Sequence, residues 1–151
     1  MSDMMQTIIA GVAVFVAGQI FLKWVIEPIH QLKKTMAEIS HMFTRYVIHN
    51  PDIVSPELTS EVFEKLRQLS GQLYGDMELI PLYSVFGWIF RLPKKEAIYE
   101  SAKLLIGIAN WMSAKHEKKF DYIIRNIQKA CDNLGLYIAP QDRISEELLQ
   151  K

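Results

Sequence analysis

Apolar residues recur at alternating steps of three and four from Ile8 to Tyr46, which is the spacing of a helical seam. The first part, Thr7 to Ile26, is an apolar run of about 20 residues with one charge, Lys23, and a helix of that length crosses a bilayer of roughly 30 Å. The second part follows Glu27-Pro28 and is polar sequence with an apolar stripe. We predict one long helix, or two nearly coaxial helices, that passes from a membrane into water.

The rest of the chain also keeps a helical period, and no stretch alternates between apolar and polar residues as a half-buried strand would. Ser55 to Glu57 is typical of a helix start, and Gly75 is expected to end that helix. Another helix opens at Pro93, and a last one ends at Gly135. The sequence therefore predicts an all-α fold, in which an N-terminal transmembrane helix continues into a cytoplasmic bundle of about four helices. The expected division is a membrane anchor at 1–28, with its span at about 7–26, and a cytoplasmic helical domain at 29–151.

The charges on either side of the apolar run predict its orientation. The first six residues, MSDMMQ, carry no Lys or Arg, whereas Lys33, Lys34 and Arg45 follow the run. The positive-inside rule then places the N-terminus outside and the C-terminal domain in the cytoplasm. A cleaved signal peptide is the alternative interpretation, but it would begin with a positive region and have a shorter apolar run. We favour an uncleaved, single-pass anchor.

Small residues within the predicted span lie in two clusters, Ala10-Gly11 and Ala17-Gly18, with Phe15 between them. Small side chains let helix backbones approach closely in lipid, and Gln19 would seek a polar partner across a helix interface. The alternative is that glycine and alanine are common in any transmembrane helix and that Gln19 reaches water. We predict that the span self-associates through Gly11, Phe15, Gly18, Gln19 and Leu22.

The same seam continues into the predicted cytoplasmic domain. It predicts knobs-into-holes contacts with other copies of the chain, and hence a homo-oligomer. The competing interpretation is that the seam packs on later helices of the same chain, because an intramolecular bundle uses the same spacing. The cytoplasmic seam residues are Ile29, Leu32, Met36, Ile39 and Phe43.

The segment Ile80 to Leu92, IPLYSVFGWIFRL, is the most apolar part of the predicted cytoplasmic domain. One interpretation is a short buried helix or a packed loop in the core. The other is a segment on the inner leaflet, with aromatic side chains in the lipid interface and a basic cluster on anionic headgroups. We favour the core, because the segment lacks the polar face of an interfacial helix. The residues of the possible membrane-surface contact are Trp88, Phe90, Arg91, Lys94 and Lys95.

Charge and candidate chemistry narrow the function classes. The chain of 151 residues carries 17 Lys and Arg against 17 Asp and Glu, so no strong field favours nucleic acid. The single cysteine, Cys131, excludes an internal disulfide framework. The group Ser113, His116 and Asp121 lacks a nucleophile elbow, and the pair Asp76 and Glu78 is typical of an N-cap region. We predict no catalytic residues, no cofactor and no metal site.

Four stretches together resemble a group of small bacterial single-span inner-membrane proteins of unassigned function. The resemblance implies a bacterial inner-membrane setting, and it implies no activity and no ligand residues. The stretches are FVAGQIFLKWVIEPI, LRQLSGQL, IPLY and LPKKEAIYESAKLLIGIANWM.

These observations favour a non-enzymatic, membrane-tethered module that self-associates and presents a cytoplasmic helical surface to a protein partner. One alternative is an oligomeric membrane effector, in which several spans form a pore that the bundle gates. The span offers only Thr7 and Gln19 as a polar lining, which favours the module. A weaker alternative is an enzyme whose site has no recognisable motif.

Overall fold

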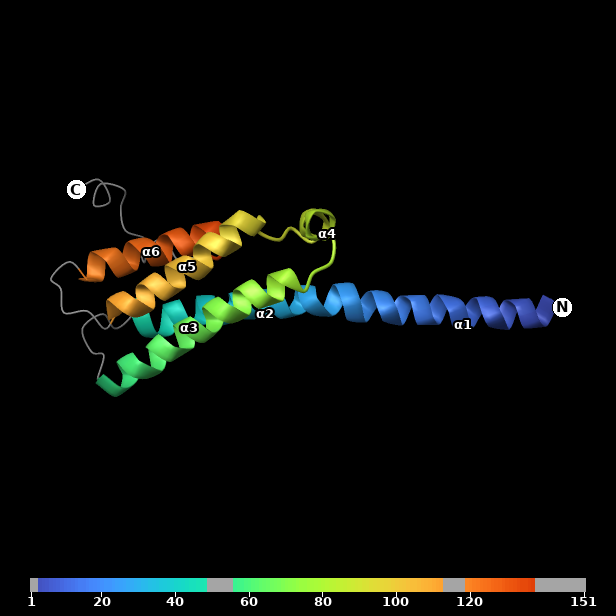
Figure 1. Cartoon of the computed structure of the whole chain (residues 1–151), viewed down its shortest axis with the longest axis horizontal. Coiled ribbons are helices and arrows are strands. Elements are labelled where there is room, and N and C mark those ends of the chain that lie inside the picture. Colours follow the sequence, from blue (N-terminus) through green and yellow to red (C-terminus); the bar gives the residue numbers. More distant parts are fainter. Residues whose placement is uncertain (1–2, 49–55, 113–118, 138–151) are drawn as a thin grey trace.

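A computed structural model describes residues 3–48, 56–112 and 119–137, which form helices and short connections with no strand among them. The predicted all-α fold is therefore confirmed for this part of the chain. Four consecutive segments make one long helix (Figure 1): α1 (Asp3–Phe21), η1 (Leu22–Ile26), α2 (Glu27–Met42) and η2 (Phe43–Ile48). The remaining helices are α3 (Pro56–Glu78), α4 (Tyr83–Ile89), α5 (Lys95–Met112) and α6 (Lys119–Leu134).

The long helix passes through Pro28 without a break. Proline has no backbone N–H to donate, and its ring crowds the preceding turn of an α-helix. The turn before it is π-helical, and the N–H of Glu27 bonds to the carbonyl of Leu22, five residues back. This wider turn accommodates the proline. The prediction of one long helix is confirmed, and no loop separates the apolar α1 from the polar α2.

The helix Asp3–Arg45 is long and apolar enough to cross a membrane, and within the described ranges it alone meets that test. Its two halves differ sharply in burial. No residue of α1 is buried, whereas α2 contributes a row of buried side chains to the bundle. In Figure 1, α1 projects from one end of the bundle, and α2 lies among α3, α5 and α6. The same continuous helix is therefore exposed along α1 and packed against other helices along α2.

The core of the bundle lies between α2, α3, α5 and α6. Each of these helices turns one apolar stripe inward, at the spacing that an amphipathic helix requires. Burying each large aliphatic side chain contributes about 1.5–3 kcal/mol relative to leaving it exposed. The fully buried aliphatic residues include Leu32 and Ile39 of α2, Leu66, Leu69 and Leu73 of α3, Leu105 and Ile108 of α5, and Ile127 of α6.

Two glycines that were expected to end helices behave differently. Gly135 ends α6 with a φ angle of 66°. The N–H of Leu136 bonds to the carbonyl of Cys131, and the N–H of Gly135 bonds to the carbonyl of Asp132. These two bonds form a Schellman motif, so this prediction is confirmed. Gly75 does not end α3, which runs on to Glu78. The continuation places Met77 in the core with none of its surface exposed.

The short helix α4 lies where α1 leaves the bundle. Figure 1 shows α4 end-on, while the long helix lies lengthwise in the same view, so α4 runs across the direction of α1. α5 begins beside α4 and leads away to the opposite end of the bundle. The predicted helix start at Ser55 falls outside the described residues.

Candidate functional site

The folded domain leaves the surface of α1 uncovered. Phe15 and Leu22 are 65% and 55% exposed, and Gln19 is exposed as well. Gly11 and Gly18 face open space, because a Cβ atom added at either glycine would meet nothing within 4 Å. All five predicted self-association residues of the span are therefore available to lipid or to another helix. Self-association through them remains a prediction.

The part of the seam that follows Pro28, which was predicted to be cytoplasmic, is already covered within this chain. Ile29, Leu32, Ile39 and Phe43 are each no more than 1% exposed, and Met36 is half-buried against the same core. The later helices of this chain cover them, which is the competing interpretation of the pattern. The seam prediction thus needs a correction: these five residues hold the bundle together and do not form a free surface for other copies. The physical reason is that intramolecular and intermolecular helix packing use the same three-and-four spacing.

A buried polar pair joins α2 to α3. The hydroxyl of Thr35 donates a 2.5 Å hydrogen bond to Oδ2 of Asp76, and both residues are buried. Two residues further along α3, Oε1 of Glu78 accepts a 2.6 Å hydrogen bond from the hydroxyl of Tyr99 on α5. This hydrogen bond raises the pKa of Tyr99. The N-cap interpretation of Asp76 and Glu78 was wrong, because both lie in the last turn of α3 and bond to other helices.

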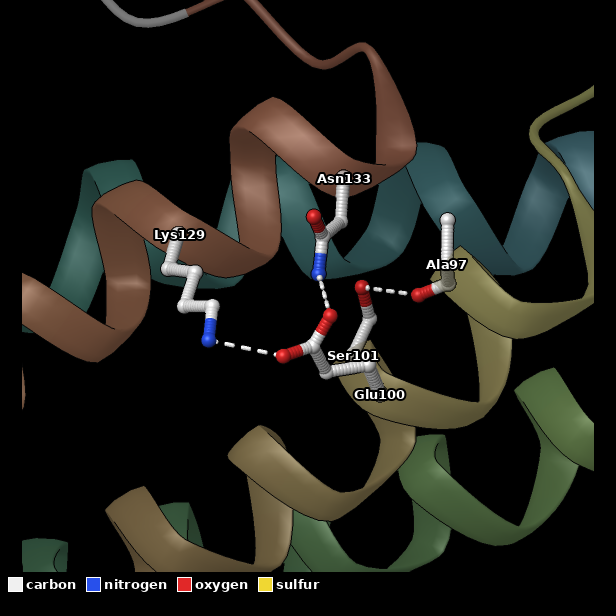
Figure 2. A network of polar contacts seen from close by, with 5 residues as sticks. All are labelled: Ala97, Glu100, Ser101, Lys129 and Asn133. Atoms are coloured by element: carbon white, nitrogen blue, oxygen red, sulfur yellow. Dashed lines mark hydrogen bonds and ion pairs between the residues drawn. The ribbon is translucent and has the colours of Figure 1, made fainter.

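A second polar group joins α5 to α6 at the surface. Figure 2 shows the carboxylate of Glu100 between Lys129 and Asn133, with its two oxygens turned to different partners. Lys129 Nζ lies 2.7 Å from Oε1, and Asn133 Nδ2 donates a 3.1 Å hydrogen bond to Oε2. The Lys129 ammonium and the Asn133 amide hold the pKa of the Glu100 carboxyl below its usual range. This group bridges α5 and α6 at the surface, and it has the geometry of a structural contact.

A groove of about 620 Å³ opens between α2 and α3. Its lining is more apolar than polar and includes both acidic and basic side chains, so the groove favours no single ligand charge. Lys65 Nζ lies 3.5 Å from Glu38 Oε2 across the two helices. The residues that line it are Lys34, Ala37, Glu38, His41, Met42, Glu61, Val62 and Lys65.

The segment Ile80 to Leu92 is not simply part of the core. Ile80 and Tyr83 are buried, but Trp88 is 81% exposed, so our preference for a core position was wrong for this tryptophan. Of the predicted membrane-surface residues, Trp88, Arg91 and Lys94 are exposed, whereas Phe90 and Lys95 are half-buried. Lys95 Nζ lies 5.5 Å from the centre of the Tyr83 ring, which places this lysine beside the start of α4.

The candidate chemical groups do not converge. Ser113 and His116 lie outside the described residues, and Asp121 is exposed on α6. His30 and His41 are both exposed on the long helix. Within residues 3–48, 56–112 and 119–137, no three side chains of His, Cys, Asp or Glu are grouped as metal ligands would be.

Comparison with known proteins adds no family. No protein-family model matches this chain, and neither a curated protein nor a solved structure matches it.

Proposed function

We propose that this protein is a membrane-tethered helical module without catalytic activity, anchored in a bacterial inner membrane with its bundle in the cytoplasm. The observation that supports this most is the continuity of the long helix. Its first segment, α1, is apolar on all sides and buries no residue, and the same helix beyond Pro28 builds the core of the bundle. Lipid is the environment that an apolar helix of this length requires.

Contacts at the end of the apolar run favour an uncleaved anchor over a signal peptide. Val25 is buried in the bundle, and the ring of Phe21 packs edge-on against Phe86 of α4 with 6.1 Å between ring centres. The end of the apolar run is thus part of the folded domain. A signal peptide is removed from the mature protein, and its removal would take these packing residues away.

The module has two surfaces for interaction in this proposal. The span associates with other copies through the face that contains Gly11 and Gly18, because the cytoplasmic seam is already covered. The groove between α2 and α3 faces a protein partner, since its largely apolar lining and mixed charges suit a protein segment. A pore is less well supported, because the Thr7 hydroxyl already bonds to the carbonyl of Asp3, which leaves Gln19 as the polar group of the lining.

The tether is tested by extracting cell membranes that contain the full chain with alkaline carbonate. We expect the chain to remain in the membrane pellet. The double variant Val14→Arg and Phe15→Arg should move to the soluble fraction, because charges at the centre of a span are costly. The control variant Gln6→Arg, at the end of the run, should stay in the pellet. Release of the wild-type chain by carbonate would contradict the proposal.

A further inference from the structure

The helix α4 has two unlike faces. Its inner face packs against the core: Tyr83 is buried there, and Phe86 is half-buried against it. The hydroxyl of Tyr83 donates a 2.7 Å hydrogen bond to the carbonyl of Pro93, in the connection between α4 and α5, and Gly87 lies against the Tyr83 ring within α4. The outer face has large apolar side chains that no described residue covers. It is made up of Val85, Trp88 and Ile89, and the neighbouring Leu79 and Leu82 extend it. All five side chains are more than half exposed.

The position of α4 relates this outer face to the proposed span. Phe86 contacts Phe21 near the end of the apolar run, so α4 lies beside the last turns of the span. Phe21 precedes Ile26 by five residues, which is about 7.5 Å along a helix. That depth matches the roughly 5–10 Å to which an interfacial helix sinks into the boundary between headgroups and acyl chains.

The direction of α4 also fits that boundary. The helix lies across the long helix and therefore parallel to the plane of a membrane that α1 would cross (Figure 1). Leu82 and Arg91 bracket it with φ angles of 47° and 52°, a region that side chains other than glycine rarely adopt. These two residues turn the chain sharply into and out of α4.

The charges beside α4 complete the pattern of an interfacial segment. Arg91 and Lys94 are exposed directly after the helix, and Lys23 is exposed where the span ends. Basic side chains at this level meet the anionic headgroups of a cytoplasmic leaflet. The indole of Trp24, which is 68% exposed, lies at the same end of the span, where tryptophan is enriched in membrane proteins.

We propose that the outer face of α4, with Leu79 and Leu82, lies in the leaflet from which the long helix emerges. This inference rests on the proposed tether and adds a second point of attachment to it. A chain that is anchored by its span alone can rotate about the axis of that span and tilt in the membrane. The second contact fixes the rotation of the bundle, and so the direction in which the groove between α2 and α3 faces. In this proposal, the outer face of α4 contacts lipid and does not contact a second copy of the chain or another protein.

The three tryptophans of the chain allow a direct test. Full-length chains that keep only Trp88, only Trp24 or only Trp111, with Phe at the other two positions, are reconstituted in vesicles of phosphatidylcholine and phosphatidylglycerol. The phosphatidylcholine carries bromine atoms, which quench nearby indoles, either close to the headgroup or deep in the acyl chains. Trp111 stacks on Tyr122 with 4.5 Å between ring centres, in the last turn of α5 and far from α4, and serves as the unquenched reference.

We expect shallow bromine to lower the Trp88 fluorescence about twofold or more, deep bromine to lower it less, and Trp111 to stay unchanged. Quenching of Trp24 without quenching of Trp88 would overturn the α4 inference and leave the tether intact. Absence of quenching at both positions would overturn the tether and the inference together. In the chain that keeps only Trp88, Val85→Asp should reduce the shallow quenching, and Gln68→Asp on the exposed face of α3 should not. Equal quenching in all of these variants would also contradict the assigned surface.

Discussion

The hydroxyl of Thr35 donates a 2.5 Å hydrogen bond to the carboxylate of Asp76, and this buried pair joins the continuation of the proposed span to α3. Leaving a buried polar group without its partner costs about 1–3 kcal/mol, and more when that group is charged. We expect Thr35→Val to lower the free energy of unfolding by at least about 1 kcal/mol. Thr35→Ser, which keeps the hydroxyl, should cost less. Thermal unfolding of the full chain in detergent, followed by circular dichroism, measures both. A Thr35→Val chain as stable as wild type would show that the pair does not hold α2 on α3.

Gly87 packs against the ring of Tyr83, which lies one turn earlier on the same helix, α4. A Cβ atom at this position would lie 3.1 Å from Cε1 of Tyr83, closer than ordinary van der Waals contact. The Tyr83 ring would have to move by a few tenths of an ångström, and its hydroxyl is held by the carbonyl of Pro93, so we expect Gly87→Ala to destabilise the fold by about 1 kcal/mol. Gly75→Ala is the matched control, because it lies in a helix with open space around it and should stabilise by about 0.5–1 kcal/mol. Denaturant midpoints of the two variants should move in opposite directions, and equal shifts would contradict this account.

The ionisation of Tyr83 predicts a loss of stability in base. Burial raises the pKa of its hydroxyl from 10.0 to about 12. Below pH 10 the folded and unfolded chains both keep the proton, so the contribution of Tyr83 to stability is fully present. Between about pH 10 and pH 12 the unfolded chain loses the proton first, and stability falls as the pH rises.

The variant Tyr83→Phe isolates this effect from that of the other tyrosines. The stability of wild type should fall more steeply than that of Tyr83→Phe across the interval from pH 10 to pH 12. Tyrosinate absorbance during a pH titration should show one fewer late-titrating group in the variant. Parallel stability curves for the two proteins would contradict the assigned pKa.

The two halves of the long helix should respond differently to substitution. Gly18 has open space around it, so a leucine there would not disturb the bundle, but it would keep two spans from approaching closely. We therefore expect Gly18→Leu to lower the mass of any oligomer in detergent while the bundle stays folded. Leu32 has none of its surface exposed, so Leu32→Glu should unfold the bundle instead of separating copies. Native mass measurement and circular dichroism on both variants distinguish these effects. A Leu32→Glu chain that stays folded but no longer forms oligomers would show instead that the seam joins copies of the chain.

The sequence predicted where the helices lie better than it predicted which surfaces they pack against. Spacing alone gave the long helix and the end of α6, because the apolar period and a glycine in the left-handed region are local features. The same local reasoning failed at Gly75, where burial of Met77 carries the helix onward. It also could not choose between two partners for Leu32, since intramolecular and intermolecular packing share one pattern.

The exposed face of α4 could not be predicted for a related reason. The segment from Ile80 to Leu92 is apolar at nearly every position, so its composition indicates burial but does not show whether the core or another surface covers each side chain. The left-handed conformation of Leu82 and the packing of Tyr83 decide which side chains turn inward. Trp88 is left outside by that geometry. The pair Thr35 and Asp76 was missed because its members are 41 positions apart in the sequence.

In the proposed topology, the long helix crosses the membrane with its first residues outside and the bundle in the cytoplasm. Labelling of single cysteines in intact cells with a membrane-impermeant thiol reagent tests this topology. The cysteines are placed at Asp3 and at Gln68, which are both exposed, in a chain that carries Cys131→Ala. We expect Asp3→Cys to react in intact cells and Gln68→Cys to react only after the cells are opened. Labelling of Gln68→Cys in intact cells, with Asp3→Cys protected, would contradict the orientation and the cytoplasmic function proposed from it.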